Sequence, residues 1–305
     1  MISRALRSTL EDALEDRIQF GVPMSRHTSL RVGGPADALA TPASRNELAR
    51  LLGVCSRHRL PHFVLGSGFN TLVRDGGIAG VVIQLKRLRG LAERPGGTLR
   101  AEAGVSHRQL TNFCAARGLS GLEFGAGIPG SIGGWVAMNA GIGSREIVDV
   151  AREVEVVSPS GRRRSHLGRD ALRFRYRALR GLAPGSVVVS VLLAVGIADP
   201  SMVRAAVDRM LAQRAHSQPL DVPSCGSVFK NPAGDFAGRL IEAAGLKGER
   251  EGGAQISTVH ANFIANTGGA SAADVLALIA RAREKVLHSS GVHLACEVQV
   301  VGRDA

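Results

Sequence analysis

The sequence predicts an α+β protein, with a ligand-binding body that extends to about residue 198 and a smaller α+β domain after it. Three observations support this prediction. Helix start signals alternate along the chain with short β-branched runs. A nearly uncharged segment, GAGIPGSIGGWVAMNAG at residues 125–141, carries six glycines. Beyond Pro200 the pattern of the predicted elements changes, which indicates a boundary there.

The helices are predicted mainly from capping boxes. A serine that precedes Glu, Gln or Asp by three residues can accept a hydrogen bond from a free backbone N–H at the start of a helix. Ser44, Ser106 and Ser271 open such boxes, and Gly118 is expected to end the second of these helices. Together with a loose amphipathic helix at the start of the chain, the predicted helices cover residues 1–20, 44–58, 106–118, 201–215, 235–245 and 271–289.

The strands are predicted from runs of β-branched and other apolar residues. Residues 187–195 form a continuous run of this kind, which is typical of a central strand. Residues 153–156 alternate between charged and apolar side chains, and the turn at 158–161 predicts a hairpin whose second strand begins at Arg162. The remaining predicted strands cover residues 61–65, 81–85 and 292–300.

The composition argues against several classes of protein. The chain has 305 residues, 45% of them hydrophobic, and a mean hydropathy of +0.08, which is ordinary for a soluble globular protein with more than one subdomain. No apolar run reaches the ~20 residues that span a bilayer, and no secretory signal is recognisable. Four scattered cysteines without a CxxC pair argue against a disulfide framework or a zinc site, so a reducing cytoplasm is expected.

The chain is strongly basic, with a formal net charge of +12 and a pI of about 10.9. Eight arginines lie within residues 161–180. Three interpretations stay open for them: a solvated hairpin, a field that attracts an anionic substrate, or a nucleic-acid surface. The third lacks support, because no nucleic-acid motif surrounds the arginines and few aromatic residues are present to stack on bases.

Two glycine-rich segments are candidates for binding phosphate. Glycine permits positive φ and lets the backbone approach a ligand closely, and successive exposed N–H groups bind anions. One segment, GSGFNT at residues 66–71, follows a predicted buried strand, and the other is residues 125–141. Neither matches the Rossmann or P-loop pattern. A structural turn is the alternative for the first segment, but together the two could hold a diphosphate.

Ser227 is a candidate for chemistry, because Gly226 before it would let the backbone turn the hydroxyl into a cleft. The alternative is an ordinary serine in a β-turn. Cys225 is a rival as a thiol nucleophile, but no base that would activate it is identifiable.

Two charged residues are further candidates. Arg177 follows Tyr176, the only tyrosine in the chain, and its guanidinium could bind a carboxylate through a planar fork. The alternative is a strand arginine on the surface. Glu297 lies between Cys296 and Val298 in the last predicted strand. Burial would raise its pKa and make it a candidate acid, whereas exposure to solvent is the alternative.

Seven motifs, in their order along the chain, closely resemble the UDP-N-acetylenolpyruvoylglucosamine reductase family, the flavoenzymes of peptidoglycan precursor synthesis. The resemblance covers about residues 20–303, nearly the whole chain. The motifs are HTSLRVGGPAD at 27–37, VLGSGFNTLVRDGG at 64–77, GLEFGAGIPGSIGGWVAMNAG at 121–141, FRYR at 174–177, GSVFKNP at 226–232, AGRLIEAAGLKG at 237–248 and HANFIANTGGASAADVLALI at 260–279.

The resemblance implies an α+β fold in which an FAD-binding domain of the PCMH or vanillyl-alcohol-oxidase type precedes a C-terminal substrate-binding domain. The implied boundaries are a helical segment at 1–20, the FAD-binding domain at 21–198 with subdomains of about 21–90 and 91–198, and the substrate domain at 199–305. The resemblance also implies non-covalent FAD and NADPH as the co-substrate. It describes a cytoplasmic enzyme, expected to be a monomer, that binds neither nucleic acid nor membrane.

Individual residues correspond to functional positions of the family. Ser227 corresponds to its proton-donating serine, and Arg177 and Glu297 correspond to its catalytic arginine and glutamate. Positions close to the substrate correspond to Tyr176, Lys230 and Asn231. Contacts with FAD are implied for Gly66, Ser67, Gly68, Phe69, Asn70, Thr71, Gly125, Gly127, Ile128, Pro129, Gly130, Ser131, Gly133, Gly134, Asn139 and Ala140. A bulky residue in place of Gly130 or Gly133 is therefore expected to give a colourless protein.

The chain departs from the family pattern at three places. Phe69 stands where the family usually has a serine, so one side-chain bond to FAD is missing while the backbone amides remain. Leu179 stands where a serine commonly follows the Tyr-Arg pair. Because Tyr176 is the only tyrosine, the chain resembles the shorter form of the enzyme, which lacks a mobile loop whose tyrosine covers the substrate.

The reaction implied by the resemblance has two stages. NADPH reduces FAD and leaves, and the enolpyruvyl ether of UDP-N-acetylglucosamine then receives a hydride from flavin N5 and a proton, which gives UDP-N-acetylmuramate. Hydride addition to the unsaturated carboxylate produces an enediolate, which Arg177 is expected to stabilise as its charge builds. Glu297 suits this role if it carries a proton, and Ser227 is expected to donate the proton to carbon. Lys230 suits a substrate with a diphosphate and a carboxylate.

Three alternatives from other classes are a flavin oxidase on the same cofactor fold, a nucleic-acid-binding protein and a non-catalytic flavin-binding regulator. The SCGSVFKNP segment argues against the oxidase, which has no need of that proton donor. Only the net charge favours the second alternative. The joint presence of Arg177, Ser227 and Glu297 argues against the third.

Overall fold

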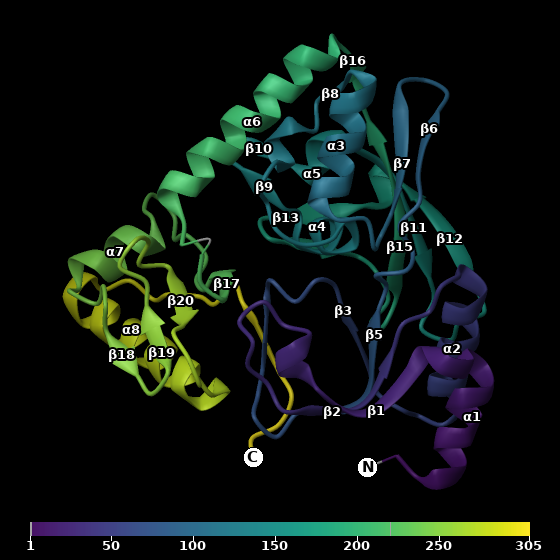
Figure 1. Cartoon of the computed structure of the whole chain (residues 1–305), viewed down its shortest axis with the longest axis horizontal. Helices are drawn as coiled ribbons and strands as arrows, with labels where there is room; N and C mark the ends of the chain where they lie inside the picture. Colours follow the sequence, from purple (N-terminus) through teal and green to yellow (C-terminus); the bar gives the residue numbers. More distant parts are fainter. Residues whose placement is uncertain (1, 220) are drawn as a thin grey trace. The chain divides into compact units, whose positions relative to one another are not determined.

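The computed structural model (Figure 1) describes residues 2–219 and 221–305, so Met1 of the predicted first helix lies outside the described residues. Two compact units are present: one contains residues 1–20, 38–67 and 80–214, and the other contains residues 21–37, 68–79 and 215–305. The units are interleaved along the sequence, whereas the expected domains at 1–20, 21–198 and 199–305 are consecutive segments. The expected domain boundaries stay a prediction. Among the described residues, no helix is both long and apolar enough to cross a membrane.

An antiparallel sheet of five strands forms the centre of the first unit. Its strand order is β12-β11-β15-β7-β6, which confirms that the run at 187–195 forms a central strand. The hairpin predicted to begin at residue 153 is confirmed by the pairing of β11 with β12. The strands are β6 (Leu91–Arg94), β7 (Thr98–Glu102), β11 (Ala151–Val157), β12 (Arg164–Gly168) and β15 (Val187–Ala194).

A second sheet has the order β1-β2-β5-β3, in which β3 and β5 run parallel. Its strands are β1 (Ile18–Pro23), β2 (Pro35–Ala40), β3 (His62–Leu65) and β5 (Ile78–Gln84). The boundaries between the two units fall inside β1, β2 and β5. β3 matters for the candidate site, because the first glycine-rich segment begins directly after it, at Gly66.

Helices and short strand pairs complete the first unit. The helices are α1 (Arg4–Leu14), η1 (Glu15–Arg17), α2 (Arg45–Arg57), α3 (His107–Arg117), η3 (Glu123–Gly125), α4 (Ile132–Met138), α5 (Ile147–Val150), η4 (Arg169–Ala171) and α6 (Pro200–Ser217), the last of which runs three residues beyond the unit boundary at Arg214. The pairs are β8 (Leu119–Ser120) with β16 (Gly196–Ile197), β9 (Gly141–Ile142) with β10 (Arg145–Glu146), and β13 (Arg173–Arg175) with β14 (Ala178–Arg180).

One face of the five-stranded sheet is apolar. Val187, Val189, Val191 and Leu193 alternate along β15, so their side chains share this face, and all four are buried. The first two pack into a core with α1 and α2, which lie side by side (Figure 1), and the last two pack into a core with α3 and α4. Burial of each such side chain stabilises the fold by roughly 1.5–3 kcal/mol.

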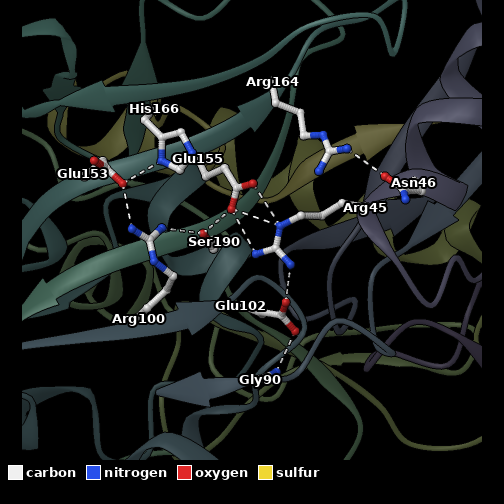
Figure 2. A network of polar contacts seen from close by, with 10 residues as sticks. All are labelled: Arg45, Asn46, Gly90, Arg100, Glu102, Glu153, Glu155, Arg164, His166 and Ser190. Atoms are coloured by element: carbon white, nitrogen blue, oxygen red, sulfur yellow. Dashed lines mark hydrogen bonds and ion pairs between the residues drawn. The ribbon is translucent and has the colours of Figure 1, made fainter. Parts of the chain in front are cut away.

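The opposite face of the sheet carries a network of polar side chains (Figure 2). Glu102 on β7 and Glu155 on β11 both lie beside Ser190 on β15. Neighbouring carboxylates repel each other, but Arg45, at the start of α2, donates hydrogen bonds to both. Arg45 Nε lies 2.9 Å from Glu155 Oε1 and Nη2 lies 3.0 Å from Oε2, while the Ser190 hydroxyl donates to Oε2 at 2.7 Å.

The same face continues with three more polar residues. Arg100 donates to Ser190 Oγ at 3.1 Å and to Glu153 Oε1 at 2.9 Å, and His166 Nδ1 lies 2.7 Å from the same glutamate oxygen. Hydrogen bonds from Arg100 and His166 hold the pKa of Glu153 below its ordinary value. We call the whole set the sheet network: Arg45, Arg100, Glu102, Glu153, Glu155, His166 and Ser190.

The second unit is built on an antiparallel sheet of order β17-β20-β19-β18. The apolar side of α8 packs against this sheet, and its Val275, Leu278 and Ile279 lie in one core with Phe229. A separate parallel pair joins β4 to β21. The elements are η2 (Met24–Arg26), β4 (Thr71–Val73), β17 (Ser224–Ser227), α7 (Ala237–Ala243), β18 (Arg250–Glu251), β19 (Ala254–Ile256), β20 (Phe263–Asn266), α8 (Ala272–Ser290) and β21 (Gln299–Val301).

The predicted helix starts are confirmed at all three serines. The reciprocal bond that completes a capping box is present at Ser106 and Ser271 and not at Ser44, because the Glu47 carboxylate accepts from Ala43 N–H and from Arg17 instead. Ser44, Ser106 and Ser271 each accept a hydrogen bond from the backbone N–H three residues later, at 3.1 to 3.2 Å. Gly118 ends α3 in the left-handed conformation, with φ +64°, as its position predicts.

Two predictions are wrong near the chain ends. The first α-helix ends at Leu14, because Glu15 adopts φ +54°, and a strand begins at Ile18. The last strand covers only Gln299–Val301, so the prediction is wrong for residues 292–298. In that segment the backbone bonds to a loop rather than to a regular ladder: Glu297 N–H, for example, donates to the carbonyl of Val228 at 2.8 Å.

Candidate functional site

The two glycine-rich segments meet at Gly66 and Ser131, which both belong to the first unit. A Cβ placed on Gly66 would lie 2.9 Å from Ser131 Oγ, closer than real Cβ contacts allow. Ser131 is buried and pairs with Ser106 in an isolated β-bridge. The carbonyl of Gly66 accepts a hydrogen bond from Gln84 Nε2 at 3.2 Å. A larger residue at position 66 would therefore require the Ser131 side chain to shift, while Ser67 beside it is exposed.

The glycines of the second segment serve two different purposes. A Cβ on Gly125 would lie 2.3 Å from the ring of Trp135, and a Cβ on Gly133 would lie 2.8 Å from Cβ of Ala103, so these two glycines allow internal packing. Gly130 has φ +118°, and a Cβ there would meet no atom within 4 Å. Only the backbone of Gly130 therefore combines a glycine conformation with open space that a ligand could fill.

The remaining residues predicted to bind the cofactor in this segment lie in mixed surroundings. Ile128 packs against the α3–α4 core, and Ala140 is buried. Pro129 is half-buried, and the Cα of Gly134 faces Ser131 Oγ, which lies 3.7 Å from where a Cβ would stand. Gly127, with φ +77°, lies against the side chain of Arg214.

Asn139 ends α4 in the left-handed conformation, with φ +43°. Its side-chain Nδ2 donates to Glu146 Oε2 at 2.6 Å and to the carbonyl of Arg175 at 3.2 Å, and its Oδ1 accepts from the N–H of Val148 at 3.0 Å. The side-chain amide is thus engaged inside the protein on both its nitrogen and its oxygen. The contact of Asn139 with FAD stays a prediction, and the geometry favours a role in fixing the end of the segment.

The second half of the first glycine-rich segment belongs to the second unit. Gly68 has φ +73°, and a Cβ there would lie 2.4 Å from the carbonyl oxygen of His27. The hydroxyl of Ser29 lies 3.0 Å from the carbonyl oxygen of Gly68 and 2.6 Å from that of Ser224. The motif at residues 27–37 therefore holds this loop beside β17.

Residues 69–71 lead from this loop into β4. Phe69 is exposed, and its backbone carbonyl lies near Gly226, 3.6 Å from where a Cβ on that glycine would stand. Asn70 Nδ2 donates to the carbonyl of Glu297 at 3.2 Å, and the N–H of Gln299 donates to the carbonyl of Asn70 at 3.0 Å. Thr71 is buried at the start of β4. A predicted cofactor-binding residue, Asn70, is thus bonded directly to the segment of a predicted catalytic residue.

Ser227 ends β17 at an irregularity of the sheet. The register between β17 and β20 shifts between Ser224 and Ser227, and Gly226 adopts φ +73°. Such a bulge re-aims the side chain that follows it and is common beside active sites. Ser227 is half-buried. The glycine predicted to turn the Ser227 hydroxyl therefore does adopt a conformation that favours glycine.

Glu297 lies directly beside the Ser227 segment. The N–H groups of Glu297 and Val298 donate to the carbonyl of Val228 at 2.8 and 3.2 Å. Phe229 and Cys296 form an isolated β-bridge. Glu297 is half-buried, so it is neither fully buried nor fully exposed to solvent, the two alternatives that the sequence left open. The structure therefore brings two of the three predicted catalytic residues, Ser227 and Glu297, into neighbouring segments of the second unit.

The two predicted substrate-binding residues that follow Ser227 have different surroundings. The N–H of Lys230 donates to the carbonyl of Ala295 at 2.8 Å, and its side chain is half-buried. Asn231 is exposed, and its Oδ1 accepts from the N–H of Ala237 at 3.0 Å, at the start of α7. Asn231 thus shapes the loop, whereas Lys230 is the candidate for a charge contact.

Arg177 lies in the first unit, at the tip of the hairpin formed by β13 and β14. Arg175 pairs with Ala178, so Tyr176 and Arg177 form a two-residue turn rather than part of a strand, which corrects the strand expectation. Arg177 has φ +54°, at a turn position that favours glycine or asparagine. Tyr176 is exposed, and the guanidinium of Arg177 lies 4.8 Å from the centre of its ring. Backbone strain of this kind is typical of functional sites.

Sequence reasoning missed two residues beside these predicted positions. Glu146 Oε1 lies 3.3 Å from Arg177 Nη1. Arg214 lies along the second glycine-rich segment, since a Cβ on Gly127 would stand 2.7 Å from its Cδ. Burial lowers the pKa of Arg214 to about 10, which still leaves it charged at neutral pH. No local pattern marks either residue, because both contacts join positions far apart in the sequence.

The alternative chemistry at Cys225 finds no support. Burial raises the pKa of this thiol to about 12, so almost no thiolate exists near neutral pH. In the described part of the chain, no cluster of three or more His, Cys, Asp or Glu side chains could hold a metal ion.

The geometry fits a bound FAD. Gly66 and Ser131 make one close contact between two glycine-rich segments, Gly130 presents backbone to open space, and the cationic Arg214 lies along the same segment. Backbone N–H groups at such loops, together with a cation, suit a diphosphate.

Comparisons with known proteins agree with these observations. Residues 36–165 match the FAD binding domain family, and residues 218–301 match the family described as UDP-N-acetylenolpyruvoylglucosamine reductase, C-terminal domain. The UDP-N-acetylenolpyruvoylglucosamine reductase of Geobacter metallireducens is 46% identical over 299 residues, which cover 98% of this chain and 99% of that protein.

Solved structures give the same result. The crystal structure of UDP-N-acetylenolpyruvylglucosamine reductase from Thermus caldophilus has a TM-score of 0.79 and 37% identity, covering 92% of this chain and 97% of its own. The glucose dehydrogenase Phl p 4.0202 has a TM-score of 0.51 and 15% identity, covering 65% of this chain and 45% of its own, which shows a shared fold alone. The predicted fold class, with an FAD-binding domain and a C-terminal α+β domain, is confirmed.

Proposed function

Because the chain belongs to the UDP-N-acetylenolpyruvoylglucosamine reductase family, we propose that it reduces UDP-N-acetylenolpyruvoylglucosamine to UDP-N-acetylmuramate with electrons from NADPH. The family makes it an FAD-dependent oxidoreductase of peptidoglycan precursor synthesis. The use of NADPH, the identity of the substrate and the roles of individual residues belong to the proposal.

In the first unit, Gly66, Gly130 and Ser131 would hold FAD, with Arg214 as a nearby cation. Bound FAD supplies the chemistry of hydride transfer from NADPH to the substrate. The close contact between Gly66 and Ser131 supports this assignment, because it brings both glycine-rich segments to one place. Ser67, Gly68, Phe69, Asn70 and Thr71 would add contacts along the first segment.

Ser227 would donate the proton. A hydroxyl is a weak acid, but the carbon that receives the proton in an enediolate is strongly basic, so a well-placed serine suffices. The observation that carries the proposal is the sheet irregularity at Ser227 beside the Glu297 segment, because it brings a serine and a glutamate into backbone-bonded segments of one unit.

Arg177 and Glu297 would stabilise the enediolate. The planar guanidinium of Arg177 can bind the substrate carboxylate through two nitrogens, and the bond strengthens as negative charge develops. Glu297 would contribute as the protonated acid, because a charged carboxylate would repel the enediolate.

Lys230, with Tyr176 and Asn231, would contact the rest of the substrate. A cation suits its diphosphate, and the net charge of +12 favours the approach of such an anion. We further propose a monomeric, cytoplasmic enzyme whose substrate domain lies within residues 199–305.

The two half-reactions, followed by anaerobic stopped-flow absorbance of the flavin, test the proposal. In Ser227→Ala, reduction of the flavin by NADPH is expected to keep its rate. Reoxidation by the enolpyruvyl sugar is expected to slow by roughly 10²–10⁴-fold, the usual contribution of general acid catalysis.

Ser224→Ala is the matched control, because Ser224 lies on the same strand and contacts Ser29 only through its backbone carbonyl. Both half-reactions are expected to keep their rates in this variant. Unchanged reoxidation in Ser227→Ala would remove Ser227 from the proton-donor role. Failure of NADPH to bleach the wild-type flavin would contradict the proposed function as a whole.

A further inference from the structure

We propose that Glu146 is a positioning residue that orients the guanidinium of Arg177 toward the carboxylate of the substrate. The inference rests on the proposed function, because it presumes that Arg177 binds this carboxylate. Glu146 ends β10, and no sequence motif draws attention to it.

Two contacts within the first unit hold the guanidinium of Arg177. Its Nη1 donates to Glu146 Oε1 at 3.3 Å, and its Nη2 donates to the carbonyl of Gly141 at 3.4 Å. Because the guanidinium is planar, contacts at two of its nitrogens fix its plane. The side chain is about one-fifth exposed, so the two contacts are partly shielded from solvent.

Glu146 is itself held in place. Its other carboxylate oxygen, Oε2, accepts the 2.6 Å hydrogen bond from Asn139 Nδ2, and its backbone N–H donates to Asp149 Oδ2 at 2.8 Å. Asn139 also donates to the carbonyl of Arg175, two residues before Arg177. These bonds form a chain of contacts from the end of α4 through Glu146 to the hairpin turn, which we call the turn chain.

The turn chain requires a carboxylate at residue 146. Both side-chain neighbours, Asn139 Nδ2 and Arg177 Nη1, are donors, so residue 146 must accept at two oxygens. A glutamine has one oxygen and one NH₂ group, so its NH₂ would face a donor on one side. Glu146→Gln therefore breaks one of the two bonds while it preserves the size of the side chain.

The contacts to Arg177 are long for charge-assisted hydrogen bonds, which usually measure about 2.7–2.9 Å. A substrate carboxylate that approached at such a distance would compete well with them. Glu146 can thus set the orientation of the arginine without preventing the stronger bond to the substrate.

The experiment measures the two half-reactions of Glu146→Gln in the FAD-loaded enzyme. Flavin reduction by NADPH is expected to keep its rate, and reoxidation by the enolpyruvyl sugar is expected to slow by about 10- to 100-fold, because small misplacements of a reacting group have effects of this size. Binding of UDP-N-acetylmuramate to the oxidised enzyme, titrated through the flavin spectrum, is expected to weaken about tenfold. Glu146→Asp keeps two acceptor oxygens and is expected to recover part of both losses.

Glu93→Gln is the control, since Glu93 pairs with Arg117 at 3.0 Å on the surface of the same unit and the substitution is identical. It is expected to change neither half-reaction. The inference is overturned if Glu146→Gln keeps its reoxidation rate while Arg177→Ala loses it, a result that leaves the proposed function intact. Loss of FAD, or equal slowing of both half-reactions in Glu146→Gln and Glu146→Asp, would also overturn it. If Arg177→Ala keeps its reoxidation rate, the proposed role of Arg177 fails as well.

Discussion

Two arginines of the first unit, Arg45 and Arg177, hold carboxylates in different ways. In the sheet network, Arg45 makes three contacts of 2.9 to 3.1 Å with Glu155 and reaches Glu102 as well. It extends from the regular start of α2. In the turn chain, Arg177 donates to one carboxylate oxygen and to one carbonyl oxygen, at 3.3 and 3.4 Å, and lies on a strained turn.

The comparison separates a structural arginine from a candidate functional one. Arg45 balances two carboxylates that lie on either side of Ser190, so the sheet depends on it. The contacts of Arg177 with Glu146 and Gly141 are longer than those of Arg45 with Glu155, so they hold its guanidinium less tightly. Residue type does not distinguish the two arginines, and only the family motif FRYR at 174–177 marks Arg177.

Arg45→Ala should have the largest effect on stability. It leaves two partly buried carboxylates without their cation, and breaking such a pair typically costs about 3–5 kcal/mol. Urea denaturation would measure the loss in the free energy of unfolding. Arg164→Ala is the control, because exposed Arg164 only donates to Asn46, and it should cost less than about 1 kcal/mol. Equal losses in both variants would contradict the structural role of Arg45.

Arg177→Ala should slow the reaction and leave the stability of the protein almost unchanged. Reoxidation of the flavin is expected to slow by about 10²–10³-fold, as when a group that stabilises an oxyanion is lost, while the free energy of unfolding changes by less than about 1 kcal/mol. Arg175→Ala provides the comparison, because Arg175 is an exposed neighbour on β13 and its contact with Asn139 uses only the backbone. A large loss of stability in Arg177→Ala would remove the contrast with Arg45.

Glu155 should make the sheet network sensitive to acid. Burial alone would raise the pKa of Glu155, but hydrogen bonds from Arg45 and Ser190 outweigh it, so the pKa lies below the ordinary value of 4.5. The stabilising effect is therefore complete above about pH 4.5 and is lost as the pH falls through the lower, folded-state value.

Glu155→Gln removes this effect, and we expect it to lower the free energy of unfolding by about 1.5–3 kcal/mol near neutral pH. Denaturation of wild type and variant across the acidic range would measure the difference. The difference should shrink in acid, and a constant difference down to about pH 3 would disprove the assignment.

The smallest effect is expected at the edge of the sheet network. His166 is about half exposed, and its Nδ1 bonds to Glu153. His166→Gln should change the free energy of unfolding by less than about 1 kcal/mol, because exposed pairs contribute little. A larger change would show that the edge of the network is as important as the pair between Arg45 and Glu155.

Sequence reasoning succeeded for structural features that depend on neighbouring residues. The three capping serines and the β-branched run of β15 follow from neighbouring residues, and the structure confirms them. Sequence reasoning failed for contacts between residues that lie far apart along the chain. Arg45 and Glu155 are 110 positions apart, Arg177 and Glu146 are 31 apart, and neither contact leaves a pattern in the sequence. The turn position of Arg177 also escaped prediction, because arginine is an unusual residue for positive φ.

The candidate catalytic residues were singled out from their residue types and surroundings, and their individual roles came from the family resemblance. Ser227 and Glu297 correspond to family positions, and the structure adds that their segments are bonded through Val228. The separate purposes of Gly130 and Gly133 could not be predicted from the sequence, because the two glycines differ only in the atoms that surround them. Replacement of Gly133 should therefore disturb the core near Ala103, whereas replacement of Gly130 should affect the cofactor more directly.

The positive φ of Arg177 has a consequence for protein engineering. Glycine adopts this conformation without the penalty of roughly 1–2 kcal/mol that a larger residue incurs. A library selected only for heat resistance should therefore enrich glycine at residue 177 and so remove the arginine that we propose binds the substrate carboxylate. Any programme that stabilises this enzyme, or an ancestral reconstruction that ranks residues by backbone compatibility, should hold residue 177 constant.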